Sequence, residues 1–312
     1  MHIRIGTRGS RLALWQADHI KSLLEKGGLT AENVIIETKG DKILDRSLST
    51  IGGKGLFTEE LEQRLRSGDI DIAVHSAKDV QSSLDSDLEL LGFTEREIVN
   101  DVLLSIDPAK KLDSGQSFIV GTSSVRRVAF LKHFFPHITV TNMRGNLQTR
   151  LRKMEEGDCD ALLLAYAGVH RMGYDALITE KIPETLFIPA VGQGSIAVEC
   201  TVSLENDKKA AIKKLINHEK TEICLLAERA FLNRMQGGCS VPVFALATTE
   251  GEELRISGGV ISLDGLELIS ENCIGTANQE QQAIALGQSL AESILSKGGE
   301  RILKMIRETR GL

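Results

Sequence analysis

Short apolar runs alternate with amphipathic helical segments through the first two thirds of the chain, and this alternation constrains the fold more than any other feature. The expected strands are His2–Gly6, Asn33–Thr38, Ile70–His75, Phe118–Gly121, Ile138–Asn142 and Ala161–Ala165. The expected helices begin near Ser10 and then cover Thr58–Arg66, Ser123–Phe134 and Asn146–Glu156. Such a pattern predicts α/β domains with mostly parallel sheets and helices on both faces.

The pattern changes near His218. A long expected helix over Glu219–Met235 ends at Gly237-Gly238. Extended segments then follow at Val241–Thr248, Glu253–Ser262 and Leu266–Ile274, the last two joined by Leu263-Asp264-Gly265 as a hairpin turn. Two further helices, Gln279–Ser296 and Glu300–Arg307, close the chain. This part of the sequence predicts an α+β domain with an antiparallel sheet.

We therefore expect two similar doubly wound α/β domains and a small C-terminal α+β domain. The first domain is expected to comprise residues 1–95 together with about 194–214. The second is expected over residues 99–190 and the third over residues 218–312.

Composition bounds the class of protein. Of the 312 residues, 42% are hydrophobic and 26% are charged, as in a folded globular protein. The net charge of −6 argues against a nucleic-acid-binding protein. The N-terminus lacks the apolar core of a signal peptide, so we expect a cytoplasmic monomer without a membrane partner. Five scattered cysteines, without a C-x-x-C pair, argue against a disulfide framework or a metal site such as zinc.

Arginines follow three of the expected strands, each where the chain enters a helix. The three junctions are Thr7-Arg8-Gly9-Ser10, Gly121-Thr122-Ser123-Ser124-Val125-Arg126-Arg127 and Asn142-Met143-Arg144-Gly145-Asn146, the last with Arg150 one turn on. A helix N-terminus offers free N–H groups to an anion, and an arginine adds a planar fork for a carboxylate or phosphate. The neighbours Arg126 and Arg127 are expected to point about 100° apart and to reach different ligand groups. Singly, each arginine is a solvated side chain; together they favour one ligand with several carboxylates or phosphates.

A polar cluster also ends the expected strand Ile70–His75. It reads Ser76-Ala77-Lys78-Asp79. In a cleft, the carboxylate of Asp79 can move a proton or stabilise a developing cation. A surface salt bridge is the alternative interpretation.

Two glycine-rich segments complete the candidate site. The stretch Gly52-Gly53-Lys54-Gly55-Leu56-Phe57 does not have the spacing of a nucleotide-binding loop and instead predicts a mobile lid, with an ordinary turn as the alternative. Cys239 follows Gly237-Gly238 and precedes Ser240. A buried cysteine is more common, but small neighbours favour an exposed thiol that is reactive or serves as an attachment point.

Taken in order, these segments resemble the porphobilinogen deaminase family. The matching stretches are residues 7–17, 39–41, 52–57, 73–80, 120–127, 143–146, 149–151, 165–173, 189–194 and 237–239. The resemblance therefore touches all three expected domains, and the ordered set is more specific than any single motif.

The resemblance implies a role for each matched residue. Cys239 would carry a dipyrromethane cofactor through a thioether, and Asp79 would be the catalytic residue. Cofactor binding is implied for Ser76, Lys78, Thr122, Ser123, Arg126, Arg127, Arg144 and Gly145. Substrate binding is implied for Arg8, Ser10, Arg150, Arg171 and Gln193, and a mobile loop for the segment with Lys54 and Phe57.

The implied function is that of a transferase in haem and porphyrin biosynthesis. It would deaminate four porphobilinogen molecules and join them head to tail on the dipyrromethane primer, releasing the tetrapyrrole hydroxymethylbilane and ammonia without a metal. The alternative is a cytoplasmic anion-binding protein without catalysis, since two α/β halves are also periplasmic-binding-protein-like. An oxidoreductase is disfavoured because no G-x-G-x-x-G motif follows a strand.

Two positions depart from the family pattern. Gln81 stands where proline is usual, which predicts a less rigid loop after Asp79. Lys39 precedes Gly40-Asp41, and a lysine there makes no bidentate contact of the kind an arginine makes.

Overall fold

The structure is a computed structural model that describes residues 1–38, 40, 58–238, 240–276 and 279–311. These residues cluster into two compact units. Unit 1 comprises the described residues of Met1–Asp45, Gly53–Glu97 and Gly194–Glu222. Unit 2 comprises those of Ile98–Gln193 and Ile223–Leu312. None of the described helices combines the length and apolar character needed to cross a bilayer.

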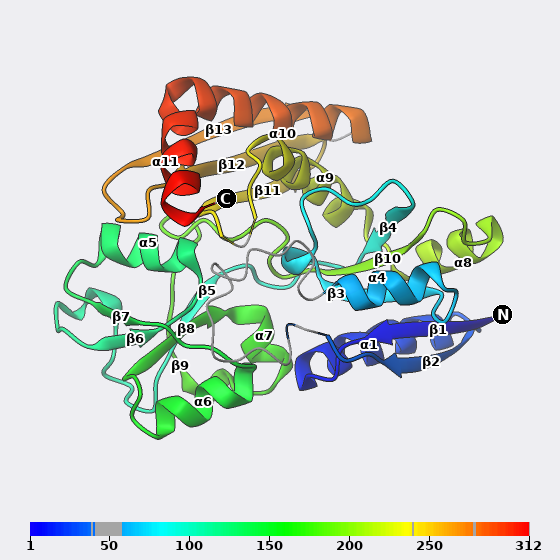
Figure 1. Cartoon of the computed structure of the whole chain (residues 1–312), viewed down its shortest axis with the longest axis horizontal. Coiled ribbons are helices and arrows are strands. Elements are labelled where there is room, and N and C mark those ends of the chain that lie inside the picture. The colour runs from blue at the N-terminus through cyan, green and yellow to red at the C-terminus, as the bar shows by residue number, and fades with distance from the viewer. Residues whose placement is uncertain (39, 41–57, 239, 277–278, 312) are drawn as a thin grey trace. The chain divides into compact units, whose positions relative to one another are not determined.

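The described part of unit 1 is built on a sheet with the strand order β2-β1-β3-β10-β4 (Figure 1). The strands are β1 (His2–Thr7), β2 (Thr30–Ile35), β3 (Ile72–Ser76), β4 (Leu88–Phe93) and β10 (Ile196–Thr201). The helices are α1 (Arg11–Lys26), α4 (Glu59–Arg66) and α8 (Asn206–Ile216), with a 3₁₀ turn η1 (Ala77–Asp79) after β3. β1 pairs in parallel with β2 and β3, whereas β10 runs antiparallel to β3 and β4.

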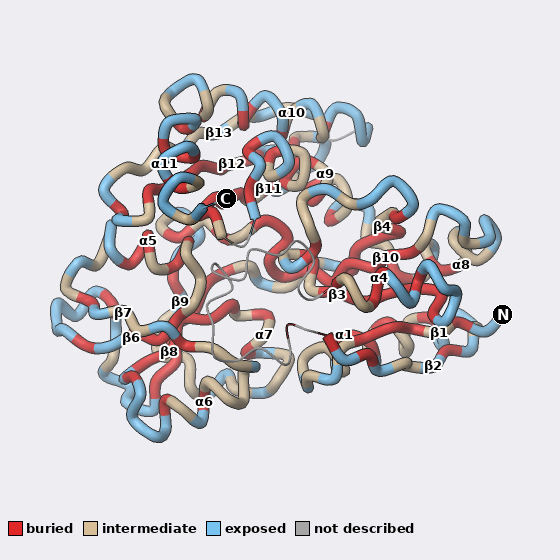
Figure 2. The backbone as a smooth tube through the Cα atoms, viewed as in Figure 1, coloured by how far each residue is buried: buried red, intermediate tan, exposed pale blue. Residues whose placement is uncertain are grey.

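Helices cover both faces of this sheet, as predicted. Successive side chains of a strand point to opposite faces. Val74 of β3 packs with Ile20 of α1, while its neighbour Ala73 packs with Leu61 and Leu65 of α4. Figure 2 shows β1, β3 and β10 buried along most of their length. The end of β3 is thereby fixed on a rigid scaffold.

The first sheet of unit 2 repeats this topology, with the order β7-β6-β8-β5-β9. The strands are β5 (Asp101–Leu104), β6 (Ile119–Gly121), β7 (Thr139–Thr141), β8 (Ala161–Ala165) and β9 (Ile178–Lys181). The helices are α5 (Val125–Phe134), α6 (Leu147–Glu155) and α7 (Tyr166–Arg171), and 3₁₀ turns lie at η2 (Leu112–Ser114) and η3 (Asp175–Leu177). β6 pairs in parallel with β7 and β8, and β5 runs antiparallel to β8 and β9.

The two sheets therefore share one arrangement, which confirms the prediction of two similar α/β parts. Both sheets are mixed rather than mostly parallel. In each, a strand distant in sequence (β10 or β5) pairs antiparallel on both of its sides. The alternating pattern predicted only the strands that helical crossovers connect, which are the parallel ones.

The C-terminal part of unit 2 is an antiparallel sheet with helices, as predicted. Its strands, in the order β11-β12-β13, are β11 (Val243–Glu250), β12 (Glu253–Ile261) and β13 (Leu268–Thr276). The helices are α9 (Glu219–Arg234), which begins in unit 1, α10 (Glu280–Ile294) and α11 (Glu300–Arg310), with a turn η4 (Leu295–Gly299) before α11.

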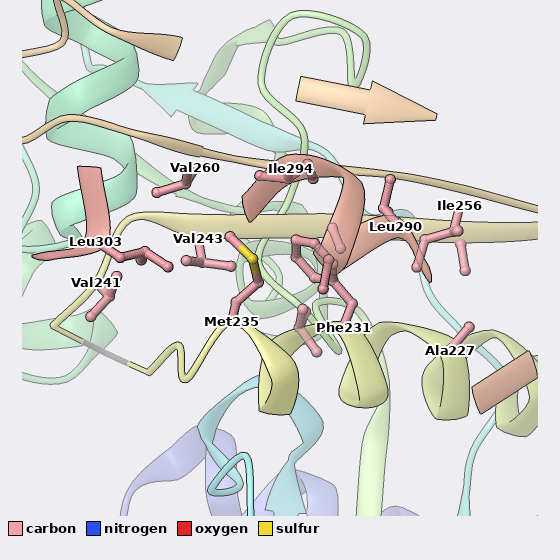
Figure 3. Packing of buried hydrophobic residues seen from close by; sticks show 14 of the residues in the cluster. Ala227, Phe231, Met235, Val241, Val243, Ile256, Val260, Leu290, Ile294 and Leu303 are labelled. Atoms are coloured by element: carbon pink, nitrogen blue, oxygen red, sulfur yellow. The ribbon is translucent and has the colours of Figure 1, made fainter. Parts of the chain in front are cut away.

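Buried side chains from these helices and strands form one core (Figure 3). Phe231 near the end of α9 and Met235 just after it pack in one cluster with Ile256 of β12 and Leu290 of α10. Burial of large apolar side chains of this kind contributes about 1.5 to 3 kcal/mol for each. The core therefore fixes the chain up to Met235, shortly before Cys239, which itself lies outside the described residues.

Candidate active site

A pocket of about 80 Å³ opens in unit 1 where β1 and β3 end. It is lined by Arg8, Ser10, Leu12, Ala13, Gln16, Thr58, Val74, His75, Ser76 and Asp79. Four of the residues singled out from the sequence, Arg8, Ser10, Ser76 and Asp79, therefore meet at one place. They lie beyond the carboxyl ends of two parallel neighbouring strands, where open α/β sheets bind their ligands.

Local backbone structure sets the position of Arg8 and Ser10. β1 ends at Thr7, and the Ser10 hydroxyl caps α1 by accepting a hydrogen bond from the backbone N–H of Ala13 at 3.3 Å. This cap holds the first turn of α1 against the pocket, and the half-buried Arg8 lies between strand and helix. The junction thus has the form expected of an anion-binding site.

Asp79 stands on the short turn η1, which is anchored on both sides. Ala77 is buried and donates its backbone N–H to Ser195 O at 3.0 Å, and Val80 is also buried. Between these anchors, Asp79 is exposed and Lys78 half-buried. The pocket lining includes Asp79 but not Lys78. An exposed carboxylate on a fixed turn can approach a ligand without reorganising the fold.

Several polar residues of this site received no role from the sequence. The Gln16 amide donates to the Ser76 hydroxyl at 2.9 Å, and Thr58 and His75 line the same pocket. His75 Nε2 lies 3.0 Å from Glu199 Oε2 of β10. His75 could have been singled out because it is a polar residue in an otherwise apolar strand. No feature of the sequence around Glu199 predicts that it contacts His75.

A second polar cluster lies inside unit 2, at the start of α5. Arg126 Nη2 donates to Asp101 Oδ2 at 2.7 Å. Arg127 donates to Asp101 Oδ1 from Nε at 3.1 Å and from Nη2 at 2.8 Å. Both arginines therefore bind the carboxylate that begins β5, a shared partner that the sequence did not predict.

The rest of this cluster is supplied by Gln193 and by main-chain carbonyls. The Gln193 amide donates to Asp101 Oδ1 at 2.9 Å and to Val99 O at 2.6 Å. Arg126 Nη1 donates to Ile188 O at 2.9 Å. Gln193 thus belongs with the arginines of unit 2.

The electrostatics of the cluster are unbalanced. Asp101 is fully buried, and Arg126 and Arg127 are nearly so. Burial alone would raise the pKa of Asp101, but the charges of both arginines outweigh it and hold this pKa well below its usual range. Among the described residues, two cations face one anion, and Arg126 Nε has no hydrogen-bond partner. The Nε–H of Arg126 is therefore a hydrogen-bond donor that the cluster leaves unused.

Other predicted site residues of unit 2 lie at the N-termini of α5 and α6. Ser124, not Ser123, caps α5, and its backbone N–H donates to Thr122 Oγ1 at 3.4 Å. At α6 the cap is Asn146, and Arg150 Nε donates to Gly145 O at 2.8 Å. Gly145 has a φ of 114°, which favours glycine.

Arg144 and Arg171 are half-buried. Burial lowers the pKa of Arg144 from its ordinary value. Arg171 ends α7. Cys239, Lys54, Phe57 and Lys39 lie outside the described residues.

Family models match nearly the whole chain. The model described as "Porphobilinogen deaminase, dipyromethane cofactor binding domain" matches residues 3–211. The model described as "Porphobilinogen deaminase, C-terminal domain" matches residues 222–296. The chain belongs to the porphobilinogen deaminase family.

Curated relatives agree with this assignment. The chain is 53% identical over 306 residues to porphobilinogen deaminase of Cytophaga hutchinsonii, covering 98% of this chain and 97% of the relative. It is 50% identical over 309 residues to that of Desulfosudis oleivorans, covering 99% of each. Among solved structures, it is similar to the periplasmic VFT2 domain of BvgS from Bordetella pertussis, with 18% identity and a TM-score of 0.39 over 68% of this chain and 92% of that one.

Family membership confirms the function expected from the sequence. The chain is a transferase of tetrapyrrole biosynthesis that acts on porphobilinogen and uses a dipyrromethane cofactor. The non-catalytic alternative is not favoured. The arginine cluster fits such a cofactor, because a dipyrromethane made from porphobilinogen carries carboxylates. Counted over the described residues, the cluster has one excess positive charge and a donor, Arg126 Nε, without a partner.

Proposed function

We propose that the unit 1 pocket is the place where porphobilinogen loses ammonia and is joined to the growing chain, with Asp79 as its catalytic residue. The observation that carries this proposal is the shared pocket of Arg8, Ser10, Ser76 and Asp79. The pocket thus combines a guanidinium that can bind a carboxylate of the substrate with two hydroxyls and one carboxylate of the protein.

Each of these groups has a distinct task. The Arg8 guanidinium binds a carboxylate side chain of porphobilinogen and fixes the ring. The Asp79 carboxylate accepts a hydrogen bond from the pyrrole N–H and offsets the positive charge that develops as ammonia leaves, which lowers the barrier. The Ser76 hydroxyl, held by Gln16, orients the substrate at the end of β3.

The dipyrromethane, when bound, supplies the pyrrole carbon to which the substrate is joined. We assign its attachment to Cys239, its side-chain carboxylates to Lys78, Thr122, Ser123, Arg126, Arg127, Arg144 and Gly145, and further substrate carboxylates to Arg150, Arg171 and Gln193. Support for this comes from the family's cofactor-binding domain, which matches residues 3–211, and from the unbalanced arginine cluster within it. Lys54 and Phe57 are assigned to a loop that covers the pocket.

The proposal includes the organisation of the molecule. We assign three domains, at residues 1–95 with about 194–214, 99–190 and 218–312, and a cytoplasmic monomer. The family model for the C-terminal domain, which begins at residue 222, supports the last boundary.

The test is single-turnover release of ammonia from porphobilinogen. Asp79→Asn keeps the shape of the side chain and removes its charge, so release should slow by about a hundred- to ten-thousandfold. The matched control is Asp69→Asn. Asp69 is an exposed aspartate of the same unit that pairs with Arg64 at 2.6 Å, and it does not line the pocket. Near-normal release by Asp79→Asn would assign catalysis to another group.

A further inference from the structure

Behind the pocket lies a buried acid–base pair to which the mechanism above gives no task. His75 Nε2 and Glu199 Oε2 are 3.0 Å apart, and their side chains are 5% and 1% exposed. His75 also lines the pocket together with Arg8, Ser76 and Asp79. The buried pair therefore lies directly beside the pocket, next to Ser76 at the end of β3.

Strand register explains why the two side chains meet. In the antiparallel pairing of β3 with β10, His75 lies opposite Ala197 and Glu199 lies opposite Ala73. His75 and Ala73 are two residues apart and share a face, so His75 and Glu199 are diagonal neighbours on that face. Both directly opposite positions are alanines, whose small side chains leave room for the imidazole and the carboxylate to touch.

This pair is poorly suited to stabilising the fold. Glu199 Oε1 is buried and has no hydrogen-bond partner in the part of the chain that the structure describes. Removing a carboxylate from water is costly unless its oxygens are satisfied, and a well-packed apolar pair commonly serves stability as well or better. A buried polar atom without a partner in a native structure requires an explanation, and here it lies beside a pocket, where a functional role supplies one.

We propose that Glu199 is a positioning residue that holds His75 with its proton on Nε2, and that His75 Nδ1 handles a proton in the pocket beside Asp79. In this arrangement Nε2 donates to the Glu199 carboxylate, which leaves the lone pair of the ring on Nδ1. This inference rests on the proposed function, because it places a second proton-handling group in the pocket of Asp79.

The proton balance defines the task. Porphobilinogen enters with a protonated aminomethyl group, and the C–N bond breaks with its electron pair leaving on neutral ammonia. Joining the rings replaces a C–H bond with the new C–C bond, so one proton must be taken up. His75 Nδ1 takes that proton, Glu199 balances the resulting imidazolium, and the proton passes to ammonia, which departs as ammonium.

The first test reads the histidine itself. Nitrogen-15 NMR of the imidazoles in the holoenzyme should show His75, identified by the loss of its signal in His75→Gln, as the Nε2–H tautomer. In Glu199→Gln the amide can both donate and accept, so a mixture of tautomers is expected. An Nδ1–H tautomer in the unaltered enzyme overturns the proposal, and this measurement does not depend on whether any Glu199 variant folds.

The second test separates chemistry from folding. With porphobilinogen as substrate, Glu199→Gln should lower kcat at least about tenfold while KM stays within about twofold. The matched control is Asp71→Asn, a buried carboxylate of the same unit that pairs with Arg4 and Lys208 and does not line the pocket. It should lower the urea midpoint and keep kcat.

Two kinetic results overturn the proposal: an unchanged kcat in Glu199→Gln, or an equal loss of kcat in Asp71→Asn. Failure of the Asp79 assignment would give a different result: near-normal release of ammonia by Asp79→Asn, while His75 still shows the Nε2–H tautomer.

Discussion

Gln16 donates a hydrogen bond from its side-chain amide to the hydroxyl of Ser76 across 2.9 Å, and so joins α1 to the end of β3 at the pocket wall. Gln16→Leu removes this bond and leaves the half-buried Ser76 hydroxyl without its donor. A hydrogen bond of this kind contributes about 0.5 to 1.5 kcal/mol, so kcat/KM for porphobilinogen should fall roughly two- to tenfold.

The control for this prediction is Gln63→Leu, which changes an exposed glutamine of α4. Steady-state kinetics of the two variants decide the matter. Equal kcat/KM in both would show that the Gln16–Ser76 bond does not serve the substrate.

The buried arginines of unit 2 should respond unequally to substitution. Asp101→Asn leaves Arg126 and Arg127 without a counter-charge, which should lower the free energy of unfolding by about 3 to 5 kcal/mol. Arg126→Leu leaves a one-to-one pair of Asp101 and Arg127, so it should cost less stability. It should nevertheless reduce the fraction of enzyme that carries dipyrromethane, because one carboxylate-binding group is lost.

Urea unfolding and intact mass measure the two effects separately. A larger loss of stability in Arg126→Leu than in Asp101→Asn, or full cofactor loading in Arg126→Leu, would contradict the excess-charge interpretation.

Acid should destabilise unit 1 through Asp71. Burial would raise its pKa, but hydrogen bonds from Arg4 and the charge of Lys208 outweigh burial and lower the pKa. A carboxyl group whose pKa is depressed by folding stabilises the protein above its unfolded pKa of about 3.9, and this contribution is lost as the pH falls through the folded value. The urea concentration at the unfolding midpoint should therefore decrease once the pH is lowered below about 4.

Asp71→Asn tests the source of this pH dependence. The variant should be less stable at pH 7 and should lose less of its remaining stability on acidification. An unchanged acid profile would place the responsible carboxylates elsewhere; among the described residues, Asp101 is the other buried aspartate with a depressed pKa.

The order of strands and helices could be predicted because each crossover is a local pattern. α1 begins after its Ser10 cap and ends at Gly27-Gly28, as its sequence indicates. Boundaries were less certain where neighbours decide them. The strand expected at Asn33–Thr38 is observed as β2 at Thr30–Ile35, because pairing with His2–Thr7 of β1 sets its extent.

The site residues on loops after strands could also be predicted, since such loops face the ligand side of a sheet. Their partners could not. Asp101 lies 25 residues before Arg126, and Glu199 lies 124 residues after His75. Both pairs form because β5 and β10 each enter a sheet from a distant part of the chain. The periodicity of a sequence does not predict which distant strand will pair with a given one.

Burial makes two of the other cysteines poor nucleophiles. Burial raises the pKa of the Cys159 thiol to about 11 and that of the Cys200 thiol to about 12. Nucleophilic thiols react as thiolates, so neither should form a thioether near neutral pH. Cys159→Ala and Cys200→Ala are therefore matched controls for substitution of the attachment cysteine.

The intact mass of the purified enzyme tests the account most directly. The unaltered chain, Cys159→Ala and Cys200→Ala should each exceed the mass of their polypeptide by one dipyrromethane and should turn over porphobilinogen. Cys239→Ala should fold, as judged by its urea midpoint, with the mass of the polypeptide alone and without activity. A Cys239→Ala chain that still carries the cofactor, or an unaltered chain without it, would contradict the account.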